Sequence, residues 1–459
     1  MSETDYDTIV IGAGSGGNAC AYALAAAGQR VAVIERERVG GECAYWACVP
    51  SKVLLRSAHP NAQSATTPGS REARAGAPHF PAAAAWRTDM VDSYRDDDHA
   101  RELREAGATL IRGDARVLGP GHVRVNATEY RAQSLVIATG SENDEPHIEG
   151  LAGRPYWTSR DATSAGEVPQ ALIILGGGAV GIELAQIFAR YGSSVTLVES
   201  SPQLLSDDDP DGAAYIARAL EHDGVSVRTG ASATSVRYDA SSVHLSIEGS
   251  SEIVGTQLCV AVGRRPRTQD FGLESLGVTF DAKGAIEIDE RCMAAPRTYA
   301  IGDVTGVGMF THVAKYQARI AAATILGKTA RASYDAIPRC VYTAPEFASV
   351  GMTRERAASE GRDLVVSFVD FSEITRPTID SDPPVTGAIS LFADAASLQL
   401  VGGWMIGPSA SETIGFIGAA IRARTPLETL LDTILPYPTY SEGLYVALDR
   451  IAHKAQAIA

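Results

Sequence analysis

A repeated segment constrains the fold of this chain more than any other feature. The first copy spans residues 8–36 and reads TIVIGAGSGGNACAYALAAAGQRVAVIER, and the second spans residues 171–200 and reads ALIILGGGAVGIELAQIFARYGSSVTLVES. Each copy has an apolar run typical of a buried parallel strand, then a G-x-G-x-x-G turn, then a helix of small residues that ends at Gly28 or Gly192. A second apolar run closes each copy. The sequence therefore predicts two strand–turn–helix–strand units.

The glycines and acids of the repeat indicate dinucleotide binding. The first glycine of such a turn permits a tight bend, the second lets a pyrophosphate approach the backbone, and the third lets helix and strand pack closely. The helix N-terminus favours phosphate, and an acid at the end of the second strand accepts hydrogen bonds from ribose hydroxyls. One copy alone can be a simple packing turn, but two complete copies predict two bound dinucleotides. The residues are Gly12, Gly14, Gly17 and Glu35 in the first copy and Gly176, Gly178, Gly181 and Glu199 in the second.

The coenzyme at the second copy is expected to be NAD rather than NADP. The carboxylate of Glu199 would repel a 2′-phosphate. Residues 200–203, which follow it, contain no arginine that could hold such a phosphate.

Composition limits the partners of the chain. With 459 residues, about three domains are expected. The formal charge of −15 argues against nucleic acid or an anionic membrane as the main partner. The start of the sequence is acidic rather than basic, and no apolar run reaches the roughly 18 residues of a membrane helix, so we expect a cytoplasmic protein. Six cysteines are too few for a disulfide scaffold.

Two of the cysteines, Cys43 and Cys48, lie in the segment GGECAYWACVPSK, residues 40–52. Cysteines five residues apart on a regular helix are about 8 Å apart, beyond the roughly 7 Å limit for a disulfide. A bridge would therefore need a distorted helical turn, with which Pro50 is compatible. The alternatives are two free thiols or half of a metal site. Neither a second close cysteine pair nor a histidine cluster completes a zinc site, so no resident metal is expected.

This segment resembles the redox-active G-G-x-C-x4-C-x-P-S-K motif of the flavin disulfide reductases, the family of lipoamide dehydrogenase, glutathione reductase and mercuric reductase. Four further segments resemble motifs of that family in the same order. They are Ala138–Gly140 (a second FAD contact), Val262–Pro266 (the end of the NAD domain), Tyr299–Asp303 (a third FAD motif) and Pro338–Thr353 (the start of the interface domain).

The resemblance implies an α/β fold with two Rossmann-like dinucleotide-binding domains, for FAD and NAD, and an α+β C-terminal dimerisation domain. The implied boundaries are 1–150 for the first part of the FAD domain with the cysteine pair, 151–270 for the NAD domain, 271–335 for the second part of the FAD domain and 336–459 for the interface domain. It also implies a homodimer, in which each active site borrows the C-terminal motif of its partner.

The resemblance further implies that electrons pass from NAD(P)H through FAD to a Cys43–Cys48 disulfide and then to a small-molecule acceptor. Cys48 would lie against the flavin as the charge-transfer thiolate, and Cys43 would be the outer thiol that attacks the acceptor. Lys52 and Glu183 match the ion pair near flavin N5. The remaining expected cofactor contacts, besides the glycines and acids of the repeat, are Gly41, Thr139, Gly140, Gly263, Gly302 and Asp303.

The C-terminal segment departs from the family. Residues 435–443 read LPYPTYSEG and align with the family's H-P-T-x-S-E motif, so that Glu442 is retained but Tyr437 replaces the acid–base histidine. A phenol is a poor base at neutral pH. Mercuric reductases resemble the chain here, since they also have tyrosine at this position. Their second tyrosine falls at Ala179, however, and the sequence ends HKAQAIA without their cysteine pair.

The cysteine segment departs as well, because Glu42 replaces the usual threonine and Tyr45, Trp46 and Ala47 replace smaller residues. These residues either reshape substrate access or repack the local core. We also expect the Ala/Pro-rich residues 61–86 to form a mobile connection or a poorly packed helix, and residues 207–209 (Asp-Asp-Asp) to form a solvated loop or a helix start.

Three functions remain open at this point. The first is an FAD-dependent reductase that uses NAD(P)H and the cysteine pair on a small disulfide or another electrophile. The second is a metal-ion reductase similar to mercuric reductase, which Tyr437 favours. The third is a redox-sensing flavoprotein without strong turnover.

Overall fold

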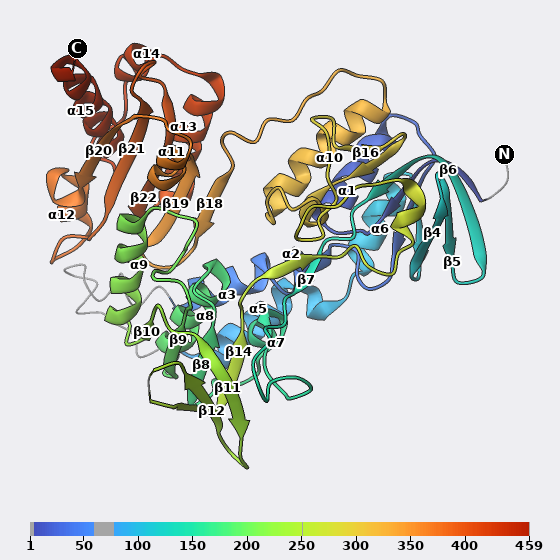
Figure 1. Cartoon of the computed structure of the whole chain (residues 1–459), viewed down its shortest axis with the longest axis horizontal. Coiled ribbons are helices and arrows are strands. Elements are labelled where there is room, and N and C mark those ends of the chain that lie inside the picture. Colours follow the sequence, from blue (N-terminus) through green and yellow to red (C-terminus); the bar gives the residue numbers. More distant parts are fainter. Residues whose placement is uncertain (1–3, 59–77, 250, 459) are drawn as a thin grey trace. The chain divides into compact units, whose positions relative to one another are not determined.

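The computed structural model describes residues 4–58, 78–249 and 251–458, and it divides the chain into two units (Figure 1). Unit 1 consists of Met1–Pro50, Trp86–Asp144 and Gly263–Ser333, and unit 2 consists of Ser51–Ala85, Glu145–Val262 and Tyr334–Ala459. Each unit is described by itself below.

Unit 1 is built around the first copy of the repeat. Its sheet has the order β16-β17-β6-β1-β2-β3, and the hairpin β4–β5 extends it beside β6. β1 pairs in parallel with both β2 and β6, and α1 packs against α10. The strands are β1 (Asp5–Ile11), β2 (Val31–Glu35), β3 (Thr109–Arg112), β4 (Ala115–Gly119), β5 (His122–Val125), β6 (Thr128–Ile137), β16 (Met293–Ala295) and β17 (Thr298–Ala300), and the main helices are α1 (Ser15–Ala26), α6 (Asp97–Glu105) and α10 (Thr311–Ile325).

Two features of unit 1 position side chains discussed below. A separate two-stranded sheet pairs β7 (Ser141–Asn143) with β15 (Arg264–Pro266). The 3-10 turn η3 (Gly302–Thr305) precedes α10. Both short elements bring distant sequence motifs together.

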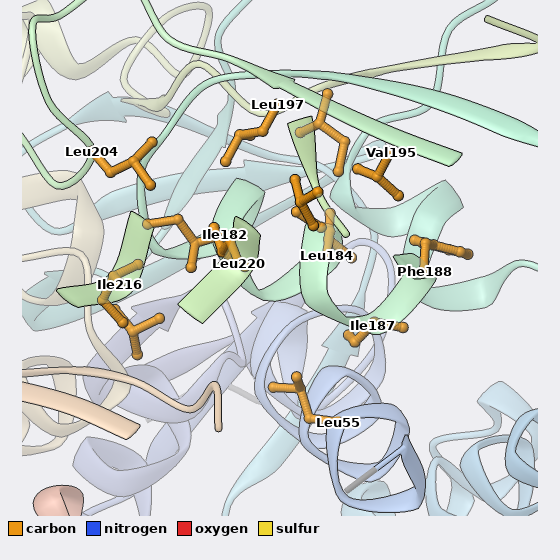
Figure 2. Packing of buried hydrophobic residues seen from close by; sticks show 14 of the residues in the cluster. Leu55, Ile182, Leu184, Ile187, Phe188, Val195, Leu197, Leu204, Ile216 and Leu220 are labelled. Carbon is orange, nitrogen blue, oxygen red and sulfur yellow. The ribbon is translucent and has the colours of Figure 1, made fainter. Parts of the chain in front are cut away.

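The second copy of the repeat lies in unit 2. It forms the parallel sheet β10-β9-β8-β14. Between β10 and β14 the chain forms a small antiparallel sheet, β11-β12-β13. The apolar side chains of α8, β9 and α9 pack together with Leu55 (Figure 2). α8 is buried from Gly181 to Phe188, a stretch that is apolar except for Glu183 and Gln186. The elements are β8 (Ala171–Leu175), β9 (Ser194–Val198), β10 (Ser226–Arg228), β11 (Ala233–Tyr238), β12 (Val243–Ile247), β13 (Ile253–Gly255), β14 (Gln257–Val260), α7 (Ser159–Ser164), α8 (Ala179–Arg190) and α9 (Pro210–His222).

The C-terminal part of unit 2 is an antiparallel sheet of the order β18-β19-β22-β21-β20, against which α13 and α15 pack. This arrangement, the mainly parallel sheet of unit 1 and the parallel sheet of unit 2 confirm the expected α/β class with an α+β C-terminal domain. The elements are β18 (Pro338–Val341), β19 (Glu346–Gly351), β20 (Leu364–Asp370), β21 (Ala388–Asp394), β22 (Leu400–Gly407), α11 (Arg354–Ser359), α12 (Arg376–Asp380), α13 (Ala410–Ala423), α14 (Leu427–Leu431) and α15 (Glu442–Ile458).

The structure differs in part from what was expected for the Ala/Pro-rich residues 61–86 and for the aspartates at 207–209. Residues 61–77 of the Ala/Pro-rich segment lie outside the described residues, whereas residues 80–86 belong to α5 (Phe80–Met90), where Phe80, Ala83 and Ala84 are buried, so this end is a packed helix. Asp209 does cap the start of α9, but it is buried and therefore not solvated. Within the described part of the chain, no helix is both long and apolar enough to cross a membrane.

Candidate active site

In the first glycine turn, in unit 1, a side chain would collide with the backbone at Gly12 and Gly17, whereas the space beside Gly14 is open. Gly12 has φ of +102°, and a Cβ added there would lie 2.3 Å from the carbonyl oxygen of Ala138. A Cβ at Gly17 would lie 2.0 Å from the carbonyl oxygen of Gly12. In contrast, a Cβ at Gly14 would meet no atom within 4 Å. This open space at the start of α1 is where a dinucleotide phosphate is expected.

Glu35 ends β2 beside this turn. One oxygen of its buried carboxylate accepts a hydrogen bond from the N–H of Ala13 at 2.8 Å, and the other accepts one from the N–H of Glu37 at 2.7 Å. A carboxylate can accept about four hydrogen bonds, so lone pairs remain for ribose hydroxyls. The residues present in the first copy therefore fit the adenosine half of a flavin dinucleotide.

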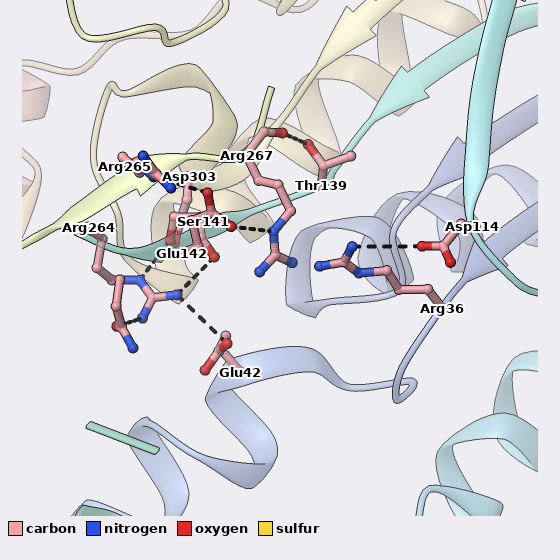
Figure 3. Close-up of polar contacts among 11 residues, drawn as sticks. Arg36, Glu42, Asp114, Thr139, Ser141, Glu142, Arg264, Arg265, Arg267 and Asp303 are labelled. Carbon is pink, nitrogen blue, oxygen red and sulfur yellow. Dashed lines mark hydrogen bonds and ion pairs between the residues drawn. The ribbon is translucent and has the colours of Figure 1, made fainter. Parts of the chain in front are cut away.

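The other three motifs of unit 1 meet around Ser141 (Figure 3). The Ser141 hydroxyl donates to Asp303 at 2.6 Å and accepts from Nε of Arg264 at 2.7 Å. The hydroxyl of Thr139 donates to the carbonyl oxygen of Arg267 at 2.7 Å. Burial raises the pKa of Asp303 despite the hydrogen bond from Ser141. Within unit 1, the structure thus brings together the chain around Thr139 and Ser141, the segment at 264–267 and Asp303.

The two cysteines lie on different short helices. Cys43 belongs to α2 (Gly41–Tyr45), whereas α3 (Cys48–Ala58) begins at Cys48. Between them the helix is interrupted at Trp46, where φ is −132°. Both cysteines are free thiols in this structure, and the thiol of Cys48 hydrogen-bonds to that of Cys43. The interruption that the five-residue spacing requires is therefore present, and it places the two sulfur atoms in contact.

The surroundings of the pair acidify Cys43. The hydrogen bond from Cys48 is the largest cause; burial opposes it, and hydrogen bonds with Thr311 and Ser15 and the charge of Lys315 add to it. Together they lower the pKa of Cys43 to about 6. Thr311 also approaches Cys48, with 3.7 Å between its hydroxyl oxygen and the sulfur. Cys43 is thus a thiolate at neutral pH, the form in which a cysteine acts as a nucleophile.

The sequence analysis missed the three residues that assist Cys43. Ser15 begins α1, and Thr311 and Lys315 lie one turn apart on α10. Ser15 stands inside the first glycine motif, so its position could have been noticed. No sequence pattern marks Thr311 or Lys315, because their closeness to the cysteines depends on the packing of α1 against α10.

The second glycine turn, in unit 2, repeats the geometry of the first. Gly176 has φ of +109°, and a Cβ at Gly181 would lie 1.9 Å from its carbonyl oxygen, whereas Gly178 is open. Glu199 accepts hydrogen bonds from the N–H groups of Gly177 and Ser201, both at 2.6 Å. Although burial opposes it, these bonds hold the pKa of Glu199 below its ordinary value. The carboxylate is therefore charged, as the expected discrimination against a 2′-phosphate requires.

Unit 2 also contains the predicted ion pair. Nζ of Lys52 lies 2.7 Å from one oxygen of Glu183, whose other oxygen accepts a hydrogen bond from the N–H of Tyr342 at 3.0 Å. The same ammonium group lies 4.6 Å from the centre of the Tyr342 ring. Glu183 is buried and Lys52 is about a third exposed. The lysine is thus held between a carboxylate and an aromatic face that the sequence analysis did not foresee.

Tyr437 and Glu442 lie in the C-terminal part of unit 2. Tyr437 is 68% exposed, and its hydroxyl donates to that of Thr375 at 3.1 Å. Glu442 begins α15, and its Oε2 atom is buried without a hydrogen-bond partner among the described residues. Among the described residues, the Tyr437 hydroxyl therefore bonds to Thr375 and not to the buried Oε2 of Glu442.

Comparisons with known proteins agree with these features. Residues 6–318 match the family model described as pyridine nucleotide-disulphide oxidoreductase, and residues 337–448 match the model of that family's dimerisation domain. The chain therefore belongs to the pyridine nucleotide-disulphide oxidoreductase family. Members of this family are NAD(P)H-dependent flavoprotein oxidoreductases that use FAD and NAD(H), which confirms the expected cofactors.

Individual relatives extend over nearly the whole chain. It is 37% identical over 458 residues to a dihydrolipoyl dehydrogenase of Thermus scotoductus, with 98% of each chain covered. It is 32% identical over 451 residues to a mercuric reductase of Bacillus cereus, with 97% of this chain and 71% of that relative covered. Among solved structures, it is similar to a Cu(II) complex of the HOCl-induced flavoprotein disulfide reductase RclA from Escherichia coli, with a TM-score of 0.86, 28% identity and coverage of 98% and 99%. The match to a dimerisation domain supports a homodimer.

Proposed function

We propose that this protein is an NADH-dependent reductase in which the Cys43–Cys48 pair delivers two electrons to a small disulfide or a similar electrophile. The observation that carries the proposal is the contact between the two thiols together with the low pKa of Cys43. When bound, FAD supplies the two-electron chemistry that connects a nicotinamide with a thiol pair.

The cysteines perform the transfer to the acceptor. The Cys43 thiolate attacks one sulfur of the substrate disulfide, which forms a mixed disulfide and releases the other sulfur as a thiolate. Cys48, already in contact with Cys43, gives its proton to the released substrate thiolate and attacks the Cys43 sulfur. The bond between Cys43 and the second substrate sulfur breaks, and that sulfur leaves as a thiolate and takes a proton from water. The products are two substrate thiols and a Cys43–Cys48 disulfide, so two electrons have left the cysteine pair. Thr311 and Ser15 hold the Cys43 sulfur during the attack.

Residues of unit 2 are assigned the positioning roles. Lys52, fixed by Glu183 and Tyr342, supplies a cation that stabilises negative charge on the cofactor. Glu199 selects NADH because its charge opposes a 2′-phosphate. Gly178 and the open start of α8 accept the pyrophosphate of this coenzyme.

An acceptor screen with NADH and NADPH in parallel tests the proposal. We expect NADH oxidation to depend on a disulfide such as lipoamide or glutathione disulfide, and Cys43→Ser and Cys48→Ser to abolish that dependence. Absence of disulfide reduction, with turnover on Hg(II) or Cu(II) instead, would replace the proposal by a metal-ion reductase. Negligible turnover with every acceptor, accompanied by reversible oxidation of the pair, would favour a redox sensor.

The metal-ion reductase is a second candidate because Tyr437 stands where the acid–base histidine is expected, and reduction of a metal ion does not need that base. The likeness to a mercuric reductase and to a Cu(II) complex of RclA supports including both ions in the screen. Paired thiols are also suitable ligands for soft metal ions.

A further inference from the structure

Two large aromatic residues of unit 1 lie where α2 ends: Tyr45 is its last residue, and Trp46 lies in the interruption before α3. Tyr45 and Trp46 are 2% and 9% exposed and pack together with Val91. The N–H groups of Trp46 and Ala47 both donate to the carbonyl oxygen of Glu42 at 2.9 Å, which closes α2 just before Cys48. The position of Trp46 therefore decides where the chain turns between the two sulfur atoms.

A cation fixes these rings from one side. The guanidinium carbon of Arg38 lies 4.9 Å from the centre of the Trp46 ring and 5.9 Å from that of Tyr45. Nε of Arg38 donates to the carbonyl oxygen of Tyr94 at 2.6 Å. The hydroxyl of Tyr45 lies 3.1 Å from the carbonyl oxygens of both Val39 and Arg95. Arg38 thus links both rings to the segment that follows α5.

That segment is bent so as to hold a third ring against Trp46. Asp92, Ser93 and Tyr94 have φ values of +47°, +50° and +60° in the 3-10 turn η1 (Asp92–Tyr94). Left-handed conformations at consecutive non-glycine residues are unfavourable and persist only where the surroundings enforce them. The bend places the Tyr94 ring against that of Trp46, with an angle of 29° between the ring planes and 6.4 Å between the ring centres.

We propose that Arg38, Tyr45, Trp46 and Tyr94 form an aromatic clamp whose function is to hold the thiols of Cys43 and Cys48 in contact. These are positioning residues, because the groups that act directly on the Cys43 thiol are Cys48, Thr311, Ser15 and Lys315. The inference rests on the proposed role of the cysteine pair. It concerns the thiols themselves, however, and its test requires no acceptor.

The test measures how fast Cys43 is alkylated by iodoacetamide as a function of pH. The purified flavin-loaded protein is first reduced, and fragmentation of the labelled peptide distinguishes Cys43 from Cys48. In the natural protein the midpoint should lie near pH 6, since the contact lowers the pKa of Cys43 to about 6. In Trp46→Ala we expect the midpoint to rise by at least about one pH unit toward the ordinary value near 8.5. Alkylation well below the midpoint should then be about tenfold slower.

Matched variants separate positioning from a general loss of stability. Trp86→Ala makes the same change at a tryptophan of unit 1 that is 45% exposed, and Tyr94→Phe keeps the ring of the clamp; both should leave the midpoint unchanged. If Trp46→Ala does not fold, Arg38→Met, which keeps all three rings, should still raise the midpoint. An unchanged midpoint in the folded Arg38→Met and Trp46→Ala proteins, whatever their melting temperatures, would overturn the proposal. Failure of disulfide turnover would instead count against the proposed function.

Discussion

Replacement of Tyr437 by histidine should increase the rate at which the protein reduces a disulfide substrate. At pH 7 an imidazole of ordinary pKa near 6.5 is about 76% unprotonated, whereas a phenol of ordinary pKa near 10 is about 0.1% ionised. Tyr437 is 68% exposed, so an imidazole meets no packing obstacle there, and the buried Oε2 of Glu442 has no hydrogen-bond partner among the described residues. We expect turnover of lipoamide to rise by about 10²-fold, the lower end of what a positioned acid–base group contributes.

The assay is NADH oxidation with saturating lipoamide between pH 6 and 9, compared with Tyr437→Phe. Tyr445→His is the matched control, because Tyr445 is 45% exposed on α15 of the same unit and lies outside the motif. Equal turnover in the natural protein and in folded Tyr437→His would refute the reasoning, since the missing base would then not limit catalysis. An equal gain in Tyr445→His would do the same.

Three further expectations concern charge. Because the pKa of Cys43 is lowered to about 6, its thiolate is lost as the pH falls, and stopped-flow oxidation of the reduced pair by a disulfide should slow about tenfold per pH unit below pH 5. Glu199→Ser should raise the ratio of kcat/KM for NADPH to kcat/KM for NADH at least about tenfold, because it removes the repulsion between the Glu199 carboxylate and the 2′-phosphate, and like charges together cost several kcal/mol. An unchanged ratio would contradict the role assigned to Glu199. Arg354→Met should lower the free energy of unfolding in urea by about 3 kcal/mol, since it leaves the charge of Asp209 buried.

The control for the last variant is Arg356→Met on the same helix, α11. Arg356 pairs with Glu360 across one helical turn, and both side chains are well exposed. Such a pair contributes about 0.5 kcal/mol. Equal losses in the two variants would show that burial of the aspartate does not set the cost.

The fold could be predicted to a large extent because its main determinants are local in sequence. Gly12 and Gly176 adopt positive φ, and a Cβ added at either would lie 2.3 Å from a backbone oxygen, so only glycine serves at these positions. The spacing to the acid follows from the length of one helix and one strand. Gly28 and Gly192 follow the helices with positive φ, as expected. Domain boundaries stay a prediction, as do the roles of the individual site residues.

Side chains whose partners are distant in sequence could not be predicted in this way. Asp208 and Asp209 read as a polar loop, but Arg339 and Arg354, more than 100 residues later, pair with them and permit their burial. The expected solvated loop is therefore wrong for both aspartates, whereas the alternative expectation, a helix start, is confirmed by Asp209, which caps α9. Thr311 is similar, because its approach to the cysteines depends on helix packing that no local pattern records.

The buried carboxylate of Glu183 has a consequence for dissecting this protein. One of its oxygens faces the Lys52 ammonium, and the other accepts the main-chain N–H of Tyr342. A fragment ending near residue 318, where the first family model stops, would lack Tyr342. The second oxygen of Glu183 would then have lost its hydrogen-bond donor while remaining buried away from water. Expression of the nucleotide-binding portion alone should therefore also change the position of the Lys52 side chain. The two segments matched by separate family models thus share one set of hydrogen bonds.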